Sequence, residues 1–238
     1  MIDDEADIVA ALAAVEARIA QACRAAGRDR SDVALLLATK TVTPRRIAAA
    51  VRAGARLIGE NRVQELVDKA DDLAGLPCER HFIGHLQTNK INLVLRHVTC
   101  IQSIDRIDLA ERIQRRLDVT DGTLDVFLQI NVSAEASKFG VPPGSAVSLA
   151  REVAALDRLR VKGLMTIGPA SPDTDAVRAG YRSLRAARDH VAEAGLGGVD
   201  ARELSMGMSG DLELAIAEGA TMVRVGSAVF GRRPVPTR

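Results

Sequence analysis

One lysine stands out because it closes the first strongly apolar run of the chain. Leu35–Ala38 is followed by Thr39 and Lys40, and Thr43 with Pro44 has the composition of a helix start. A short apolar run that ends in a turn signal is typical of a buried parallel strand. Lys40 is therefore expected at the carboxyl end of a strand, where parallel α/β folds bind ligands. A partly desolvated lysine there becomes a nucleophile, whereas the ordinary alternative is a solvated lysine.

Two loops of small residues late in the chain could hold an anion. The first runs from Ser205 and Met206 to Ser209, and the second from Gly226 and Ser227 to Gly231. Glycine lets backbone N–H groups approach an anion, and serine hydroxyls add donors. Barrel folds often hold a phosphate between the loops after strands seven and eight. Each loop alone would be a tight turn with a capping serine, but together they predict a phosphate site.

Arg224 lies in the last predicted strand. Strand alternation sends Val223 and Val225 to one face and Arg224 to the other, into the mouth of a barrel. A buried arginine needs a partner, which is either a carboxylate such as Glu60 or an acceptor atom of a ligand.

The lysine, the phosphate loops and the inward arginine together suggest pyridoxal 5′-phosphate (PLP). This cofactor has an aldehyde for Lys40, a phosphate for the loops and a ring nitrogen for Arg224. Arginine keeps its proton, so it would donate a hydrogen bond to the ring nitrogen. PLP held in this way is a poorer electron sink than PLP paired with an aspartate.

The elements that position these groups follow a strand–helix rhythm. An amphipathic helix over 6–26 ends before Gly27. Strands are predicted at 33–38, 56–59, 81–84, 98–101, 126–132, 161–167, 203–206 and 222–225, and helices at 44–53, 62–73, 88–96, 105–117, 143–156, 173–194 and 210–218. This pattern predicts an α/β fold, a single (β/α)8 TIM barrel with an extra N-terminal helix. An open doubly wound sheet is the alternative.

The predicted organisation is one domain over residues 1–238. Within it, the helix of residues 1–27 packs on the barrel, and residues 234–238 form a frayed tail.

Composition narrows the class of function. The 32 basic and 31 acidic residues give no bulk attraction to nucleic acid or membrane, and the few aromatic residues do not suggest a stacking platform. Cys23, Cys78 and Cys100 lack metal-like spacing and read as free thiols in a reducing cytoplasm. We therefore expect a cytoplasmic protein with no metal site, no nucleic acid partner and no membrane contact. The lack of an extra apolar stripe favours a monomer.

Several segments in order resemble the pyridoxal phosphate homeostasis proteins, a family related to the N-terminal barrel domain of alanine racemase. The resemblance spans nearly the whole chain from the first strand onward. It rests on Ala38–Thr41, Gly59–Glu65, His81–Lys90, Gln129–Val132, Ser137–Gly140, Gly163–Thr166, Leu204–Ser209 and Met222–Gly231. It implies a fold-type III PLP-binding barrel.

The resemblance also implies roles for individual residues. Lys40 would hold PLP as a Schiff base, and Arg224 would lie near the ring nitrogen. The remaining candidates for cofactor binding are Asn61, Ser205, Met206, Gly226 and Ser227 for the pocket and phosphate, with His85 and Lys138 as further ones. Lys138 would assist cofactor exchange, and the alternative is an ordinary surface lysine. Arg62 stands where many relatives carry a tyrosine.

The implied function is PLP binding, intracellular vitamin B6 homeostasis and supply of PLP to apo-enzymes, without an established reaction. A first alternative is a weak amino-acid racemase that uses Lys40 as one base. Racemisation needs a second base, which in alanine racemase is a tyrosine from a separate domain, and Tyr181 lies in a predicted helix. A second alternative is a barrel aldolase, in which Lys40 reacts directly with substrate.

Overall fold

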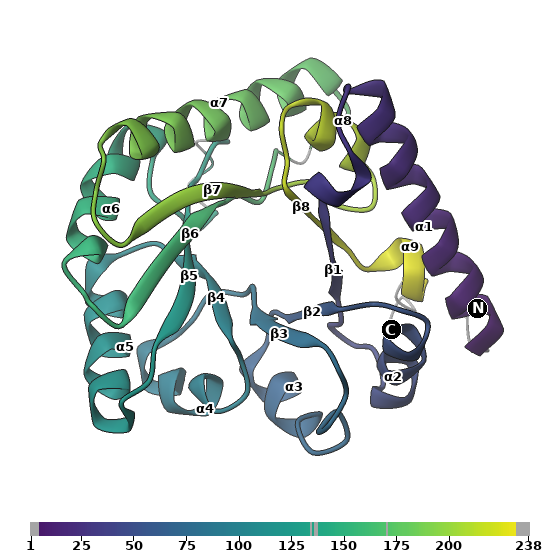
Figure 1. Ribbon diagram of the computed structural model, residues 1–238, viewed down its shortest axis with the longest axis horizontal. Coiled ribbons are helices and arrows are strands. Elements are labelled where there is room, and N and C mark those ends of the chain that lie inside the picture. Colours follow the sequence, from purple (N-terminus) through teal and green to yellow (C-terminus); the bar gives the residue numbers. More distant parts are fainter. Residues whose placement is uncertain (1–4, 134, 136–137, 170, 232–238) are drawn as a thin grey trace.

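Parallel strands close into a barrel with helices around it. The structure is a computed structural model that describes residues 5–133, 135, 138–169 and 171–231. Over these residues the strands follow one another around the barrel in the order β1-β2-β3-β4-β5-β6-β7-β8, and β8 pairs with β1 (Figure 1). The predicted (β/α)8 barrel is confirmed, and the open sheet is wrong.

Each strand precedes the helix that covers it. The strands are β1 (Ala34–Ala38), β2 (Leu57–Glu60), β3 (Glu79–Phe82), β4 (Cys100–Ile104), β5 (Leu124–Gln129), β6 (Leu159–Met165), β7 (Val199–Ser205) and β8 (Met222–Val225). The helices are α1 (Glu5–Ala25), α2 (Pro44–Arg52), α3 (Val63–Asp68), α4 (Ile91–Leu95), α5 (Ile107–Thr120), α6 (Ala146–Ala154), α7 (Thr174–Glu193), α8 (Leu212–Ala217) and α9 (Ser227–Phe230).

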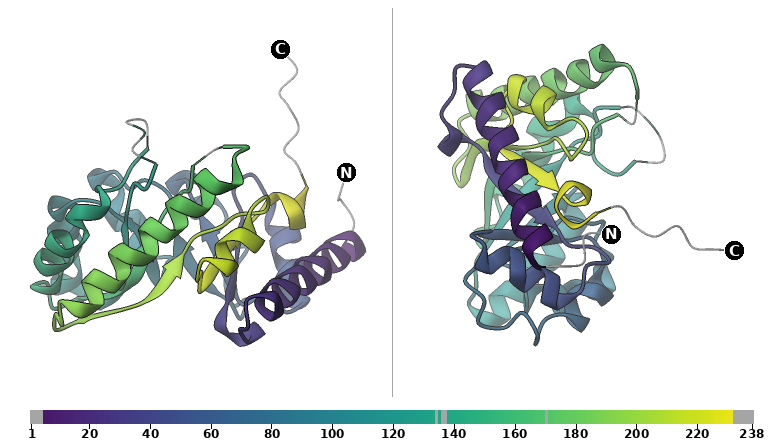
Figure 2. Two further views of the ribbon diagram at one scale, coloured as in Figure 1. Left: turned by 90° about the horizontal axis from the view of Figure 1, so that it is seen from above. Right: turned by 90° about the vertical axis from the view of Figure 1, so that its right-hand side faces the viewer.

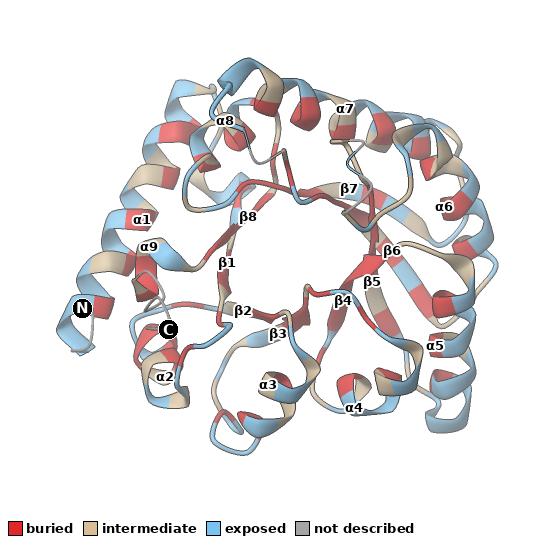
Figure 3. Cartoon of the chain, turned by 180° about the vertical axis from the view of Figure 1, so that it is seen from behind, coloured by how far each residue is buried: buried red, intermediate tan, exposed pale blue. Residues whose placement is uncertain are grey.

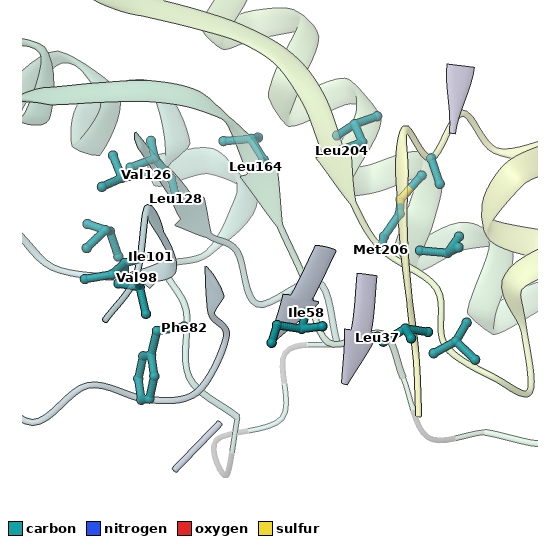
Figure 4. Packing of buried hydrophobic residues seen from close by; sticks show 14 of the residues in the cluster. Leu37, Ile58, Phe82, Val98, Ile101, Val126, Leu128, Leu164, Leu204 and Met206 are labelled. Carbon is teal, nitrogen blue, oxygen red and sulfur yellow. The ribbon is translucent and has the colours of Figure 1, made fainter. Parts of the chain in front are cut away.

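Strand alternation divides the buried side chains into two groups. Side chains such as Leu37 and Phe82 belong to the large core between strands and helices (Figure 4). Their neighbours along the strands, such as Leu36 and Phe127, form a separate, smaller cluster with Met165 inside the barrel. A strand buried on both faces needs apolar residues at nearly every position, which explains the continuous apolar runs of the sequence.

The extra N-terminal helix α1 lies outside the barrel wall. It runs alongside α8 and α9 and contacts α2 (Figures 1 and 2). Its buried stripe contains Ile8, Leu12, Val15 and Ile19, spaced three or four apart as the sequence predicts. The buried stripes of the surrounding helices are the red patches in Figure 3. Helix α1 thus covers the outer side of the segment where the barrel closes.

Several predicted boundaries are wrong. The fourth strand begins and ends later than 98–101, so Gln102 and Ser103 belong to β4. The predicted helix 62–73 ends at Asp68, and its last part forms turns. Strand β7 begins four residues before the predicted position, and α9 was not expected. Apolar runs locate strands well, but they do not show where polar residues continue inside a barrel.

Other expectations concern the ends of the chain and the thiols. Cys23, Cys78 and Cys100 are free, as predicted. No helix within the described ranges is long and apolar enough to cross a membrane. The predicted frayed tail, 234–238, lies outside the described residues.

Candidate functional site

A hollow opens where β1 and β8 end, at the carboxyl edge of the barrel. Its volume is about 390 Å³, within the range of small-molecule sites. The lining residues come from the ends of β1 and β8, from the loops that follow β1, β7 and β8, and from helices α2 and α9. They are Ala38, Lys40, Thr41, Val42, Arg46, Met208, Ser209, Gly210, Arg224, Gly226, Ser227, Phe230 and Gly231.

Lys40 is an exposed residue at the start of the loop between β1 and α2. Thr43 is the N-cap residue of α2 and Pro44 its first residue, so the predicted helix start is confirmed. The loop is therefore short, and Lys40 lies on the wall of the hollow, two residues after the end of β1. The predicted place of Lys40, at the carboxyl end of the first strand, is confirmed.

The serine that lines the hollow after β7 is Ser209. Its Oγ accepts a hydrogen bond from the backbone N–H of Ala228 at 3.3 Å, which ties the two predicted phosphate loops together. The sequence predicted Ser209 as a helix cap, but Asp211 is the N-cap residue of α8. Gly207, at φ 91°, turns the chain between Met206 and Ser209 in a conformation that favours glycine.

Ser205 and Met206 lie below the hollow. Both are fully buried, and Met206 packs in the apolar core between strands and helices. Ser227 and Gly226 line the hollow itself. A Cβ on Gly226 would lie 3.0 Å from the carbonyl oxygen of Ala38, so the ends of β1 and β8 approach each other closely.

Arg224 points into the barrel, as strand alternation predicts, and it is 5% exposed. Its Nη1 donates to Ser205 Oγ at 2.8 Å, and its Nη2 donates to the carbonyl oxygen of Thr166 at 2.6 Å. Burial lowers the pKa of Arg224 to about 10, so the guanidinium keeps its proton at neutral pH.

The suggested pairing of Arg224 with Glu60 is wrong. Glu60 Oε1 instead accepts from Lys69 Nζ at 2.6 Å, beneath helix α3. The reason is alternation in β2, since Gly59 faces the barrel interior against Leu36 and Glu60 therefore faces outward.

A chain of hydrogen bonds continues from Arg224 through the barrel interior. Ser205 Oγ donates to Gln102 Oε1 at 2.7 Å, and Gln102 Nε2 lies 2.8 Å from His81 Nδ1. Burial lowers the pKa of His81 to about 4, so the ring is neutral at pH 7 and Nδ1 accepts the bond from Gln102. Ser205 donates its hydroxyl proton to Gln102, and Gln102 donates to His81. The Ser205 oxygen can therefore accept the hydrogen bond from Arg224.

Tyr181 holds the loop that carries Ser209. Its side chain is fully buried, and its hydroxyl donates to Asp211 Oδ2 at 2.8 Å. Asp211 Oδ1 in turn accepts from the backbone N–H of Met208 at 2.6 Å. Burial and the neighbouring Asp211 raise the pKa of Tyr181 well above its usual value. The tyrosine therefore acts as a neutral donor that fixes this loop.

The remaining sequence candidates lie over other strands. Asn61 and His85 line a second hollow of about 620 Å³ together with Arg62. Asn61 Oδ1 is buried and has no hydrogen-bond partner among the described residues. The His85 ring stacks on Phe139 with 3.7 Å between centroids. None of these residues is among those that line the hollow of Lys40.

Lys138 connects two loops at the barrel mouth. Its Nζ donates to Glu135 Oε1 at 2.7 Å and to the carbonyl oxygen of Gly168 at 3.0 Å. Only 17% of its side chain is exposed, so it is more than a solvated surface lysine. Ser137, the residue before Lys138 in the segment Ser137–Gly140, lies outside the described residues.

Sequence reasoning missed the contributions of Arg46 and Gln102. Arg46 lines the hollow from α2, donates to the carbonyl oxygen of Phe230 at 2.5 Å and lies over the ring of that residue. No motif marks it. Gln102 could have been found by extending the fourth strand one residue beyond its predicted end at 101, because alternation then places it inside with Cys100.

Comparisons with known proteins agree with this fold. A family model described as alanine racemase, N-terminal domain, matches residues 11–234, so the chain has the barrel of that class. The pyridoxal phosphate homeostasis protein of Aquifex aeolicus is 42% identical over 222 residues, covering 93% of this chain and 96% of that protein. The chain belongs to the family of pyridoxal phosphate homeostasis proteins.

Two solved structures are similar over most of their length. A protein of unknown function from Bifidobacterium adolescentis has a TM-score of 0.92 and 44% identity, covering 97% of this chain and 98% of that one. The PipY protein of Synechococcus elongatus PCC7942, solved with PLP bound, has a TM-score of 0.78 and 32% identity, covering 90% and 100% of the two chains.

The buried His81 predicts a loss of stability in mild acid. Because its folded pKa of about 4 lies below the usual 6.5, the unfolded chain binds a proton between these values and the folded protein does not. Stability therefore falls as pH drops through this window, by about 2 kcal/mol from pH 7 to pH 5. Urea unfolding at pH 7 and pH 5 should show this loss of stability. In His81→Asn, which keeps an acceptor for Gln102, the loss between the two pH values should be smaller by about the same 2 kcal/mol.

The exposed His190→Asn serves as the matched control and should keep the wild-type pH dependence. Equal losses in wild type and His81→Asn would contradict a neutral His81 at the end of the hydrogen-bond chain.

Proposed function

We propose that this protein binds PLP in the hollow above β1 and β8 and serves intracellular PLP homeostasis. The observation that carries the proposal is the meeting of an amine, a buried guanidinium and two serine hydroxyls on one hollow. These groups belong to Lys40, Arg224, Ser209 and Ser227. The relatives named for PLP homeostasis and the PLP-bound structure of PipY support the same ligand.

The residues present suit each part of PLP. Ser209, Gly210, Gly226 and Ser227 offer hydroxyls and backbone N–H groups for a phosphate. A Cβ on Gly210 would meet no atom within 4 Å, so this part of the wall is open. Arg46 adds positive charge on the same wall. The hollow can therefore accept a dianionic phosphate at one end.

Lys40 supplies the covalent attachment. The bound cofactor contributes an aldehyde, which is the electrophile at this site. Lys40 Nζ would be the nucleophile toward that aldehyde, and one water molecule would leave for each carbon–nitrogen double bond formed. No oxidant or reductant is needed, and the step is reversible, as storage and release require.

Arg224 sets the character of the site. Ser205 and the Thr166 carbonyl hold its guanidinium, which remains charged at neutral pH. A donor that keeps its proton leaves the ring nitrogen of PLP unprotonated. We therefore propose that Ser205 and the backbone of Met206 act from below, by placing Arg224, while Ser209 takes the phosphate.

Holding PLP is favoured over the two catalytic alternatives. Racemisation needs a second proton-transfer group opposite Lys40, and Tyr181 is buried and bonded to Asp211. A cofactor-free aldolase leaves the inward Arg224 and the paired serine loops without a role. Asn61, His85 and Lys138 lie farther around the mouth, and we propose that they contact PLP as it enters or leaves.

Covalent attachment predicts a Lys40-dependent absorbance. Wild-type protein mixed with PLP should show a band near the visible edge that borohydride bleaches, with one adduct on Lys40 by mass spectrometry. Lys40→Ala should lose the band and the adduct, because no other side chain on the hollow offers an amine in the described residues. Lys162→Ala, which removes an amine paired with Asp200, is the matched control and should keep both. A borohydride-stable adduct elsewhere in Lys40→Ala would contradict this attachment.

The two serines should differ in what they recognise. Ser209→Ala should weaken PLP binding about tenfold and leave pyridoxal, which lacks the phosphate, unchanged, because a hydrogen bond to a charged group is worth about 1.5–3 kcal/mol. Ser205→Ala should weaken both ligands by a similar factor, because it acts through Arg224. Titration of both ligands by fluorescence checks this. Loss of PLP binding alone in Ser205→Ala would return the phosphate role to Ser205.

We further propose that the protein works as a cytoplasmic monomer that supplies PLP to apo-enzymes. Lys40 is exposed at the hollow, which gives an acceptor access to the bond. The loaded protein should activate an apo-enzyme faster than PLP appears free in buffer. Transfer no faster than release would contradict supply, and sedimentation of the loaded protein checks the monomer.

A further inference from the structure

A buried ion cluster lies directly behind the loop that carries Lys40. Lys69, 8% exposed, donates from Nζ to Glu60 Oε1 at 2.6 Å, to Glu65 Oε2 at 3.0 Å and to the carbonyl oxygen of Thr39 at 2.9 Å. The cluster is on the outer side of β1 and β2, beneath α3, and its ions do not line the hollow. It therefore needs a role other than direct ligand contact.

The cluster holds the residues on both sides of Lys40. Thr39 Oγ1 donates to Glu60 Oε1 at 2.7 Å, and the Thr39 carbonyl accepts from Lys69. The backbone N–H of Thr41 donates to Glu65 Oε2, the same oxygen that Lys69 contacts. One ammonium thus connects the residue before Lys40 to the residue after it.

Thr41 has a conformation that needs such support. Its φ is 62°, in the left-handed region, which β-branched residues rarely adopt. A residue remains there only when its surroundings impose it, and such residues cluster at functional sites. The bond from Thr41 N–H to Glu65 is an interaction that favours this backbone turn directly.

The charge state of Glu65 suits this task. Burial alone would raise its pKa, but the bonds from Thr41 N–H and Lys69 outweigh it, and the pKa is lowered. Glu65 is therefore an anion at neutral pH, which makes it a strong acceptor for Thr41. Burial raises the pKa of its neighbour Glu60. The cluster thus contains a contact to Thr41, whose backbone is strained, and a carboxylate, Glu60, whose burial is unfavourable. Burying such ions contributes little net stability, so stability alone is a poor explanation for the cluster.

We infer that Glu65 and Lys69 are positioning residues for Lys40: they hold Thr41 in the left-handed conformation and so aim the Lys40 amine into the hollow. The inference rests on the proposed function, because it concerns how the amine meets an aldehyde. Neither residue touches the hollow in this arrangement. Their effect passes through the backbone of Thr39 and Thr41.

The test measures the rate at which PLP, trapped by borohydride, is attached to Lys40. Glu65→Met removes the acceptor and should slow attachment by on the order of 10- to 100-fold, as expected when a reacting group is misplaced. Glu65→Gln keeps an acceptor oxygen and should stay near the wild-type rate. Glu16→Met on α1, which removes a carboxylate paired with Arg30, is the matched control and should leave the attachment rate unchanged.

A second substitution separates positioning from general destabilisation. Glycine adopts positive φ without strain, so Thr41→Gly no longer needs the Glu65 contact. Thr41→Gly combined with Glu65→Met should return the attachment rate to within about threefold of wild type. If Glu65→Met does not fold, Glu65→Asp keeps the charge but withdraws it from Thr41, and the same rescue should appear.

Hydrogen exchange of the Thr41 amide in PLP-free protein gives a readout without the cofactor. It should quicken in Glu65→Met and stay slow in Glu16→Met. Wild-type attachment rate or unchanged exchange in folded Glu65→Met, or no rescue by Thr41→Gly, overturns the positioning role. Failure of the wild type itself to attach PLP at Lys40 overturns the proposed function and this inference with it.

Discussion

The buried guanidinium of Arg224 is the charge that the barrel interior is arranged to hold. Its acceptors are neutral, the Ser205 hydroxyl and the Thr166 carbonyl, so its charge is not cancelled by a bonded carboxylate. Neutral groups can hold the guanidinium because each donates its own proton to the next group, Ser205 to Gln102 and Gln102 to His81. The orientation of every group is then fixed by the one before it. The result is a hollow whose floor stays positively charged, which suits an anionic ligand.

A different network performs the complementary task outside the strands. Lys69 and Lys40 lie near the same strand ends, yet Lys69 is surrounded by two carboxylates and Lys40 is exposed at the hollow. Alternation in β2 creates this division, because Gly59 leaves room for the Leu36 side chain inside the barrel and Glu60 faces helix α3. The Glu60 carboxylate is therefore held on the outer side of the barrel wall, whereas Asp211, on the loop of Ser209, acts electrostatically on Arg224. The hollow is thus lined by the cations Lys40, Arg46 and Arg224, whereas the cluster of Lys69 outside the strands contains two carboxylates for one ammonium.

These two networks explain how far the sequence could be interpreted. Alternation over Val223, Arg224 and Val225 predicted the inward arginine correctly, because the boundaries of that strand were clear. The same alternation rule, applied to Ile58, Gly59 and Glu60, would have predicted that Glu60 faces outward and cannot pair with Arg224. Gln102 was hidden because the predicted end of the fourth strand was three residues too early. The choice between Ser205 and Ser209 depends on a left-handed turn at Gly207. Periodicity predicts faces, whereas single backbone turns and long-range partners require the three-dimensional arrangement.

The use of the tyrosine bears on the kind of chemistry the fold supports. A second proton-transfer group must reach the ligand and change its protonation state near neutral pH. Tyr181 meets neither condition, since it is fully buried, its pKa is raised, and its hydroxyl fixes Asp211 and thereby the loop of Ser209. The same side chain therefore fixes the loop of Ser209 and is not placed to transfer a proton to a ligand. The proposed combination of a phosphate site, an exposed lysine and a ring-nitrogen donor that is charged at neutral pH suits holding and releasing a reactive aldehyde better than transforming an amino acid.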